Sequence, residues 1–213
     1  MRSHHLSLPN IRDQAYRLAY RLACEQLARM DVEQQCLRSG AKSMDSSKVI
    51  IEYLNRPYVI SLPNVEISLE DSAEEVPLKD KIFVLHYLTL AKGTPGTSKL
   101  ITFKQLPGCA SYFPVFEQLA IKPLLDHFGK EPELLPEAAA KLGGHKANYG
   151  DIGVTVNAFS KVPITIALWR GDGEFAPRGS IMFDSNICDY LPIEDIRDIC
   201  ATVARRLVSL GKH

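Results

Sequence analysis

The segment Val154-Thr-Val-Asn-Ala-Phe-Ser-Lys-Val-Pro-Ile-Thr-Ile-Ala-Leu-Trp169 decides the fold. It contains two runs rich in β-branched and apolar residues, 154–159 and 162–169, which are typical of strands. The second run alternates poorly between polar and apolar residues, which is the pattern of a strand covered on both faces. We therefore expect two strands here, the second of them buried.

The residues after this segment predict a loop, a third strand and a helix. Trp169-Arg-Gly-Asp-Gly-Glu-Phe-Ala-Pro177 combines acidic residues with glycine and proline, so we expect a tight loop between buried strands. Ser180-Ile-Met-Phe183 follows as a short strand. Residues 192–210 then predict a helix, because a proline and two acidic residues suit its first turn and two arginines suit its end.

The residues before the segment predict helices. Residues 112–128 have helical spacing, with Pro123 expected to kink or divide the helix. A shorter helix is expected over 133–142, ended by two glycines. Residues 80–91 are apolar nearly all round, which is typical of a buried helix.

Residues 48–69 predict three strands, with Asn55-Arg-Pro57 as a turn between the first two. Residues 10–38 predict helices, with Asn10 as an N-cap and a second short helix beginning near Asp31. The expected apolar face of the first helix includes Ile11, Ala15, Leu18, Leu22 and residues 24–27.

This order of elements indicates an α+β fold in which a mainly antiparallel sheet packs against helices. We expect residues 154–159, 162–169 and 180–183 in one sheet, covered by the 192–210 and 80–91 helices. Residues 1–40 are expected to form an N-terminal helical arm, and residues 41–213 the α+β domain.

Composition narrows the function classes. The chain has 213 residues, 46% of them hydrophobic, and 25 basic residues balance 25 acidic ones. Zero net charge argues against a dedicated nucleic-acid binder. No apolar run is long enough to span a bilayer and no secretory segment is recognisable, so we expect a cytoplasmic protein without a membrane partner. The five cysteines are widely spaced, so we expect most of them to be buried and none to form a self-contained metal site.

A series of sequence blocks lies in order between residues 40 and 210. The blocks are Val84-Leu-His-Tyr-Leu88, Ile101-Thr-Phe-Lys-Gln-Leu-Pro-Gly108, Tyr112, Leu142-Gly-Gly144, Phe159-Ser-Lys-Val-Pro-Ile164, Trp169-Arg-Gly-Asp-Gly-Glu-Phe175, Phe183-Asp184 and Leu191-Pro-Ile-Glu-Asp195. With these blocks the chain resembles an uncharacterised family, DUF3786, of anaerobic bacteria and archaea. Some members of that family carry a four-cysteine Fe–S module also found in corrinoid iron–sulfur proteins, and this chain lacks it. The resemblance implies a place in anaerobic redox or corrinoid metabolism and transfers no catalytic residue.

The acidic loop supplies one candidate site. Asp172, Glu174 and Asp184 converge if the strands on either side of the loop are neighbours, and clustered carboxylates suit a hard cation or acid–base chemistry. Trp169 is either a core residue or the wall of a pocket for a flat ligand. The structural alternative is a hairpin turn without a ligand, because Asp-Gly is a common turn signal.

His86 supplies a second candidate, because a neutral imidazole in an apolar helix can ligate haem iron or corrinoid cobalt. A buried histidine bonded to a backbone carbonyl is the structural alternative. His145 is expected on an exposed loop.

Two function classes remain open. The first is a non-catalytic accessory protein that binds an organic or tetrapyrrole-like cofactor or small molecule, with an Fe–S protein as a possible partner. The second is an enzyme that uses the acidic-loop carboxylates, with or without a divalent metal. The first is favoured because the sequence shows no nucleophile or metal-ligand signature. The sequence names no cofactor.

Overall fold

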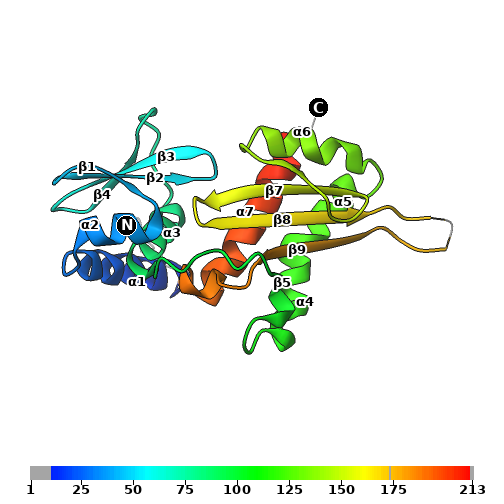
Figure 1. The fold of residues 1–213 in the computed structure, drawn as a ribbon, viewed down its shortest axis with the longest axis horizontal. Helices are drawn as coiled ribbons and strands as arrows, with labels where there is room; N and C mark the ends of the chain where they lie inside the picture. The colour runs from blue at the N-terminus through cyan, green and yellow to red at the C-terminus, as the bar shows by residue number, and fades with distance from the viewer. Residues whose placement is uncertain (1–10, 173, 212–213) are drawn as a thin grey trace, which may run out of the picture.

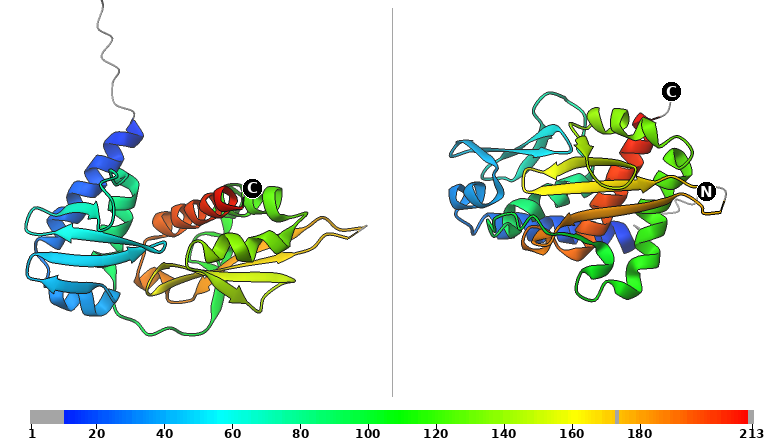
Figure 2. Two further views of the ribbon diagram at one scale, coloured as in Figure 1. Left: turned by 90° about the horizontal axis from the view of Figure 1, so that it is seen from above. Right: turned by 45° about the vertical axis from the view of Figure 1, so that its right-hand side comes forward.

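The computed structural model describes residues 11–172 and 174–211, which form two lobes (Figure 1). Residues up to 90 build the first lobe and residues from 100 onward build the second. Each lobe has an antiparallel sheet and helices, which confirms the α+β class. The segment 91–99 carries the chain from one lobe to the other (Figure 2).

The first sheet has the order β1-β2-β3-β4 and covers the helices of the first lobe. The three strands expected between residues 48 and 69 are confirmed, and β1 precedes them. The turn after β2 lies at Leu54 and Asn55, whose φ values are 50° and 61°. The expected turn at 55–57 is therefore partly wrong, because Arg56 and Pro57 already pair with β2. The strands are β1 (Lys42–Asp45), β2 (Lys48–Tyr53), β3 (Arg56–Ser61) and β4 (Glu66–Leu69).

The second sheet has the order β5-β9-β8-β7-β6. The three strands expected to share a sheet are adjacent in it, as β7, β8 and β9. Five consecutive residues of β8, Ile164 to Leu168, are buried, so both faces of β8 are covered as expected. His145 lies in an edge strand and not in the expected loop, although it is exposed. The strands are β5 (Leu100–Thr102), β6 (His145–Ala147), β7 (Ile152–Phe159), β8 (Val162–Trp169) and β9 (Arg178–Asp184).

The helices of the second lobe lie close to the positions predicted from the sequence. The helix expected over 112–128 is divided before Pro123 by a π-helical stretch, Glu117–Ile121. The last helix, α7, crosses one face of the second sheet (Figure 2). The helices are α4 (Phe113–Phe116), α5 (Lys122–Phe128), α6 (Leu135–Ala140) and α7 (Ile193–Leu210).

The helices of the first lobe are α1 (Ile11–Leu27), α2 (Val32–Ser39) and α3 (Leu78–Leu90). The expected second helix is confirmed, with the Asp31 side chain accepting a hydrogen bond from the Gln34 N–H. Asn10, the expected N-cap of the first helix, lies outside the described residues. The chain from 11 to 39 packs on α3 and so belongs to the first lobe.

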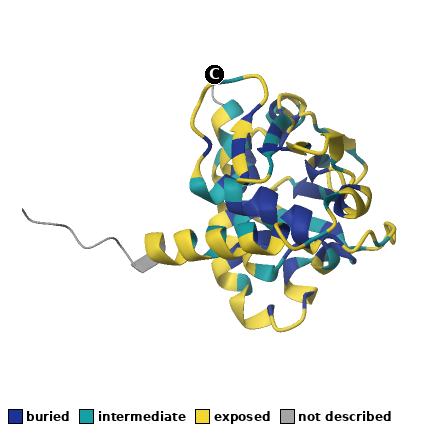
Figure 3. Cartoon of the chain, turned by 90° about the vertical axis from the view of Figure 1, so that its left-hand side faces the viewer, coloured by how far each residue is buried: buried dark blue, intermediate teal, exposed yellow. Residues whose placement is uncertain are grey.

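The expected apolar face of α1 is wrong in its middle and right at its end, where Leu27 is buried; the Ile11 side chain lies outside the described residues. Ala15, Leu18 and Leu22 are exposed, and Figure 3 shows most of this helix facing solvent. The side packed against α3 carries Ala23 and Leu27, which are buried. The side chains of α1 divide between two apolar stripes, and among the described residues only the stripe of Ala23 and Leu27 packs against another helix.

Two turns interlock the lobes. The turn after β2 reaches the second lobe, where the Leu54 N–H donates to the Ala158 carbonyl at 3.0 Å. The turn between β7 and β8 reaches the first lobe, where the Ser160 hydroxyl donates to the Ser39 carbonyl at 2.9 Å. The buried apolar side chains of both lobes form one continuous core.

The position of α3 differs from the expectation. It packs beside α1 and α2 in the first lobe and was expected to cover the second sheet. Its Tyr87 ring stacks on Phe159 of β7. None of the helices in the described residues combines the length and apolarity needed to cross a membrane.

Candidate functional site

A cleft of about 540 Å³ lies where the outer face of the first sheet meets the turn between β7 and β8. One wall comes from β1, β2 and β3, and the other from Asn157, Phe159 and Ser160. The cleft therefore contains side chains from both lobes. Contacts between domains are a common location for ligand pockets, and this volume lies within the range of such pockets.

The strand register places the polar groups of the first wall. Glu52 of β2 lies opposite Pro57 of β3, and the Glu70 N–H donates to the Pro57 carbonyl from the other side. Neighbouring strands lie about 4.8 Å apart, so the backbones of Glu52 and Glu70 are about 10 Å apart across Pro57. In the next row, Lys42 of β1 lies opposite Ile50. The wall is an apolar strip with two carboxylates and one ammonium group.

The base of the cleft is aromatic and rigid. The rings of Tyr87 and Phe159 are parallel, with centroids 4.1 Å apart. The Tyr87 hydroxyl donates to the Ser39 carbonyl and accepts from the Lys161 N–H at 3.2 Å. Burial raises the pKa of Tyr87 to about 12, so its hydroxyl keeps its proton at neutral pH and acts as a structural donor.

Four side chains in the cleft are available to a ligand. Lys42, Glu52, Glu70 and Asn157 are exposed. Within the part of the chain that the structure describes, their side chains form no hydrogen bond or ion pair, whereas the Ser160 hydroxyl is bound to Ser39. The cleft thus offers charged and amide groups above an apolar base.

The acidic loop does not converge on Asp184. Asp172 and Glu174 are exposed in the segment linking β8 and β9, beyond the pair formed by Trp169 and Arg178. Asp184 ends β9 at the opposite end of the strand. Because a strand rises about 3.3 Å per residue, β9 alone separates the two positions by about 20 Å. The structure does not bring the expected carboxylate cluster together.

Asp172 has a local role. Its carboxylate accepts the N–H groups of Glu174 and Phe175 at 2.9 and 2.8 Å. These backbone hydrogen bonds lower the pKa of Asp172. Such contacts are typical of an aspartate that closes a turn. Trp169 is half-buried at the end of β8, and it does not line the cleft.

Asp184 holds the segment that connects the lobes. Its carboxylate accepts hydrogen bonds from the Thr97 hydroxyl at 2.6 Å and from the N–H groups of Thr97 and Ser98 at 2.9 and 3.0 Å. Burial raises the pKa of Asp184, but these bonds and one from the Asn186 N–H together lower it below its usual value. The Asp184 carboxylate thus stabilises the connecting segment through hydrogen bonds within the fold.

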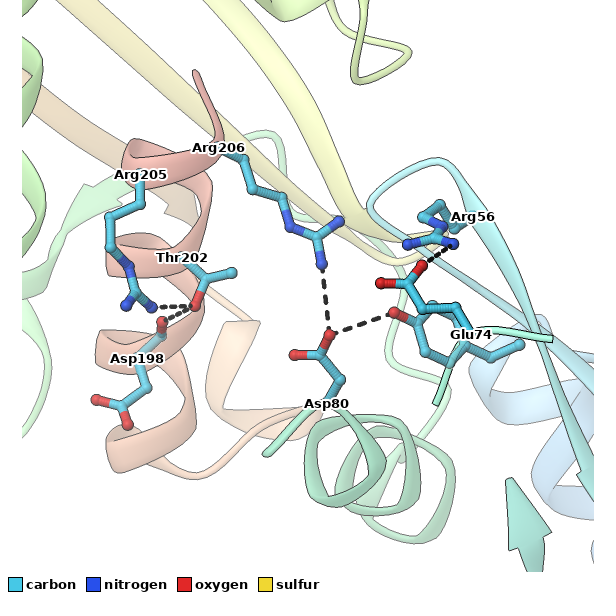
Figure 4. Close-up of polar contacts among 8 residues, drawn as sticks. Arg56, Glu74, Asp80, Asp198, Thr202, Arg205 and Arg206 are labelled. Carbon is cyan, nitrogen blue, oxygen red and sulfur yellow. Dashed lines mark hydrogen bonds and ion pairs between the residues drawn. The ribbon is translucent and has the colours of Figure 1, made fainter. Parts of the chain in front are cut away.

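His86 joins α3 to α7. Its Nδ1 lies 2.6 Å from the Asp195 carboxylate, and neither side chain lines the cleft. Two further ion pairs join the same helices, Lys79 with Asp198 at 2.7 Å and Asp80 with Arg206 at 3.4 Å (Figure 4 shows the latter). The three contacts make His86 part of the contact between lobes.

The Nδ1 of His86 is bonded to Asp195, which leaves only its Nε2 for a metal, and neither residue lines the cleft, so the cleft itself offers no histidine to a haem or corrinoid. A metal centre is not indicated elsewhere either: within residues 11–172 and 174–211, no group of three histidine, cysteine or acidic side chains has suitable geometry. Three of the five cysteines are buried and all five are free, as expected for structural residues.

Sequence reasoning missed the cleft. Glu52 occupies an ordinary outward position on β2, Glu70 directly follows β4, and Lys42 lies in a strand that was not predicted. The one available signal was the block Phe159-Ser-Lys-Val-Pro-Ile164, whose turn forms the second wall.

Comparison with known proteins gives one match. No curated protein and no solved structure matches the chain. The model of a domain of unknown function, DUF3786, matches residues 31–206, which include every element of the cleft. The match begins after α1, so the exposed helix lies outside the part that is shared with the family. Because the match covers most of its length, the chain belongs to the DUF3786 family.

Proposed function

We propose that this protein is a non-catalytic binding protein whose ligand, a small organic molecule, occupies the cleft between the lobes. The observation that carries the proposal is the cleft itself, where uncommitted polar side chains surround an apolar base. Small-molecule sites commonly combine an apolar lining with a few polar groups that fix orientation.

The contents of the cleft favour binding over catalysis. No histidine or cysteine is found among the described residues that line it. The Ser160 hydroxyl donates to a backbone carbonyl and has no base beside it that would activate it as a nucleophile. The separation of Asp172 and Glu174 from Asp184 also removes the geometric support for an enzyme built on the acidic loop.

The kind of metabolism in which this ligand takes part, and the partner protein, stay predictions from the sequence. The family resemblance implies anaerobic redox or corrinoid metabolism and an Fe–S protein partner. The position of His86 gives no support to a tetrapyrrole, so a smaller organic molecule is the better candidate for the cleft.

Titration of the ¹⁵N-labelled protein with indole, nicotinamide and cyclohexanol tests the proposal. We expect saturable shifts of the amide signals of Ala41, Glu52 and Asn157 with at least one of these neutral probes. Asn157→Ala removes an uncommitted cleft side chain, so binding should weaken about fivefold, the value of one neutral hydrogen bond.

Asn64→Ala provides the matched control, because Asn64 is an exposed asparagine that does not line the cleft. Its binding constant should equal that of the wild type. Shifts scattered over the surface, or equal weakening in both variants, would contradict a specific site in the cleft.

A further inference from the structure

A second cavity, of about 280 Å³, collects three cationic side chains from both lobes. Arg56 comes from the start of β3, Lys141 from the end of α6, and Arg206 from α7. Among the described residues that line this cavity there is no aspartate or glutamate. Three like charges facing one space repel one another, and an anion placed between them relieves that repulsion.

The carboxylate partners of these cations lie outside the lining. Arg56 donates to Glu74 at 3.1 Å, Lys141 lies 3.6 Å from Glu137, and Arg206 donates to Asp80 (Figure 4). A guanidinium group has five N–H donors, so single contacts of this kind leave donors free.

Arg206 contacts Asp80 through one of its guanidinium nitrogens. Burial raises the pKa of Asp80, and the opposing effect of Arg206 does not cancel this increase. The contact between them is long, at 3.4 Å. This contact leaves other N–H donors of Arg206 for an anion, and its guanidinium carbon lies 5.7 Å from the centre of the Tyr53 ring.

The remaining lining suits a small molecule with one anionic group. Asn55 and Ser209 bring an amide and a hydroxyl to the cavity, and Leu54, Leu142 and Leu210 form apolar edges. The negative end of α7 would oppose an anion, but Lys141 donates to the Leu210 carbonyl at 3.1 Å and offsets it.

We propose that this cavity binds an oxyanion, the phosphate or carboxylate group of a small molecule, which Arg56 of the first lobe and Lys141 and Arg206 of the second hold between them. This site is separate from the cleft on the outer face of the first sheet. Bidentate donors of arginine match the geometry of both phosphate and carboxylate.

Titration of the ¹⁵N-labelled protein with inorganic phosphate and, in a second arm, with sodium acetate tests this proposal at constant ionic strength set by sodium chloride. We expect saturable shifts of the Asn55, Leu142 and Ser209 amides in at least one arm, and the stronger arm identifies the anionic group. Binding should weaken about tenfold in Lys141→Gln and in Arg56→Gln, because each variant loses a charged contact. The cleft amides of Ala41 and Asn157 should not move.

Lys122→Gln is the matched control. Lys122 and Lys141 are both exposed lysines that pair with an acidic residue four positions earlier or later on a helix, and only Lys141 lines the cavity. Lys122→Gln should bind as the wild type does. Absence of saturable shifts in both arms, or equal weakening in Lys122→Gln and Lys141→Gln, overturns the proposal. Because the chain has equal numbers of basic and acidic residues, a general attraction for anions does not explain a selective loss.

Discussion

Among single residues, Gly40 occupies a position that disfavours any side chain. It ends α2 with a φ of 74°, and a Cβ atom at this position would lie 2.7 Å from the Ser160 Oγ. We expect Gly40→Ala to lower the free energy of unfolding by about 1–3 kcal/mol, because a side chain adds left-handed strain and a collision with the interlocking turn. Urea denaturation measures this change.

A second variant separates the two causes at Gly40. In the Ser160→Ala background the collision is removed and the strain remains, so Gly40→Ala should cost less there than in the wild type. An equal cost in both backgrounds would show that Ser160 plays no part.

Asp184 gives a residue-level prediction with a pH dependence. Its folded-state pKa is lowered, so the carboxylate stabilises the folded protein above the usual value of 3.8, and this contribution is lost as the pH falls through the lowered pKa. We expect Asp184→Asn to be about 1 kcal/mol less stable at pH 7, and the difference in stability to narrow as the pH falls below about 4. Denaturation curves from neutral to acid pH check the sign, and a difference that widens in acid contradicts it.

Between elements, the contact of α3 with α7 is carried by charged pairs. Lys79 and Asp198 have side chains only 27% and 14% exposed, so solvent screens this pair less than a surface pair. We expect a double-mutant cycle of Lys79→Met and Asp198→Asn to give a coupling energy of about 1 kcal/mol or more. Lys81 lies on the same helix without an ion pair among the described residues, and the matching cycle with Lys81→Met should give a coupling near zero.

Elements that depend on local chemistry were predictable from the sequence. The β-branched runs of β7 and β8 and the division of the helix at Pro123 required no knowledge of distant residues. The packed face of α1 was not predictable, because Leu18 and Leu22 form an apolar stripe as regular as the stripe of Ala23 and Leu27. Periodicity reveals a stripe, but only the tertiary structure decides which stripe has a partner.

The same limit applies to the candidate site. The density of acidic residues near Trp169 was visible in the sequence, but the strand that separates Asp172 from Asp184 places them at opposite ends. The cleft joins residues near Glu52 with Asn157, and this proximity arises from the interlocked lobes. No local pattern records it.

For the whole molecule, the continuous core and the two interlocking turns imply that the lobes unfold together. Native-state hydrogen exchange followed by mass spectrometry can measure each lobe separately. We expect the most protected amides of β2 and β8 to report the same free energy of opening, since the buried side chains of both lobes belong to one core. Protection of β2 that disappears at a lower urea concentration than that of β8 would contradict this coupling.

The interlocking turns also determine when the first lobe can complete its folding during synthesis on the ribosome. When residues 11–90 have emerged, the Leu54 N–H still lacks the Ala158 carbonyl, and the Tyr87 ring still lacks Phe159. Domains generally fold as units in the order of their synthesis, but this first lobe must wait for a segment translated much later. Its apolar contact surface stays open during that interval. We expect a translational pause before Ala158 and Phe159 emerge from the ribosome to lengthen this period, and a pause after their emergence to leave it unchanged.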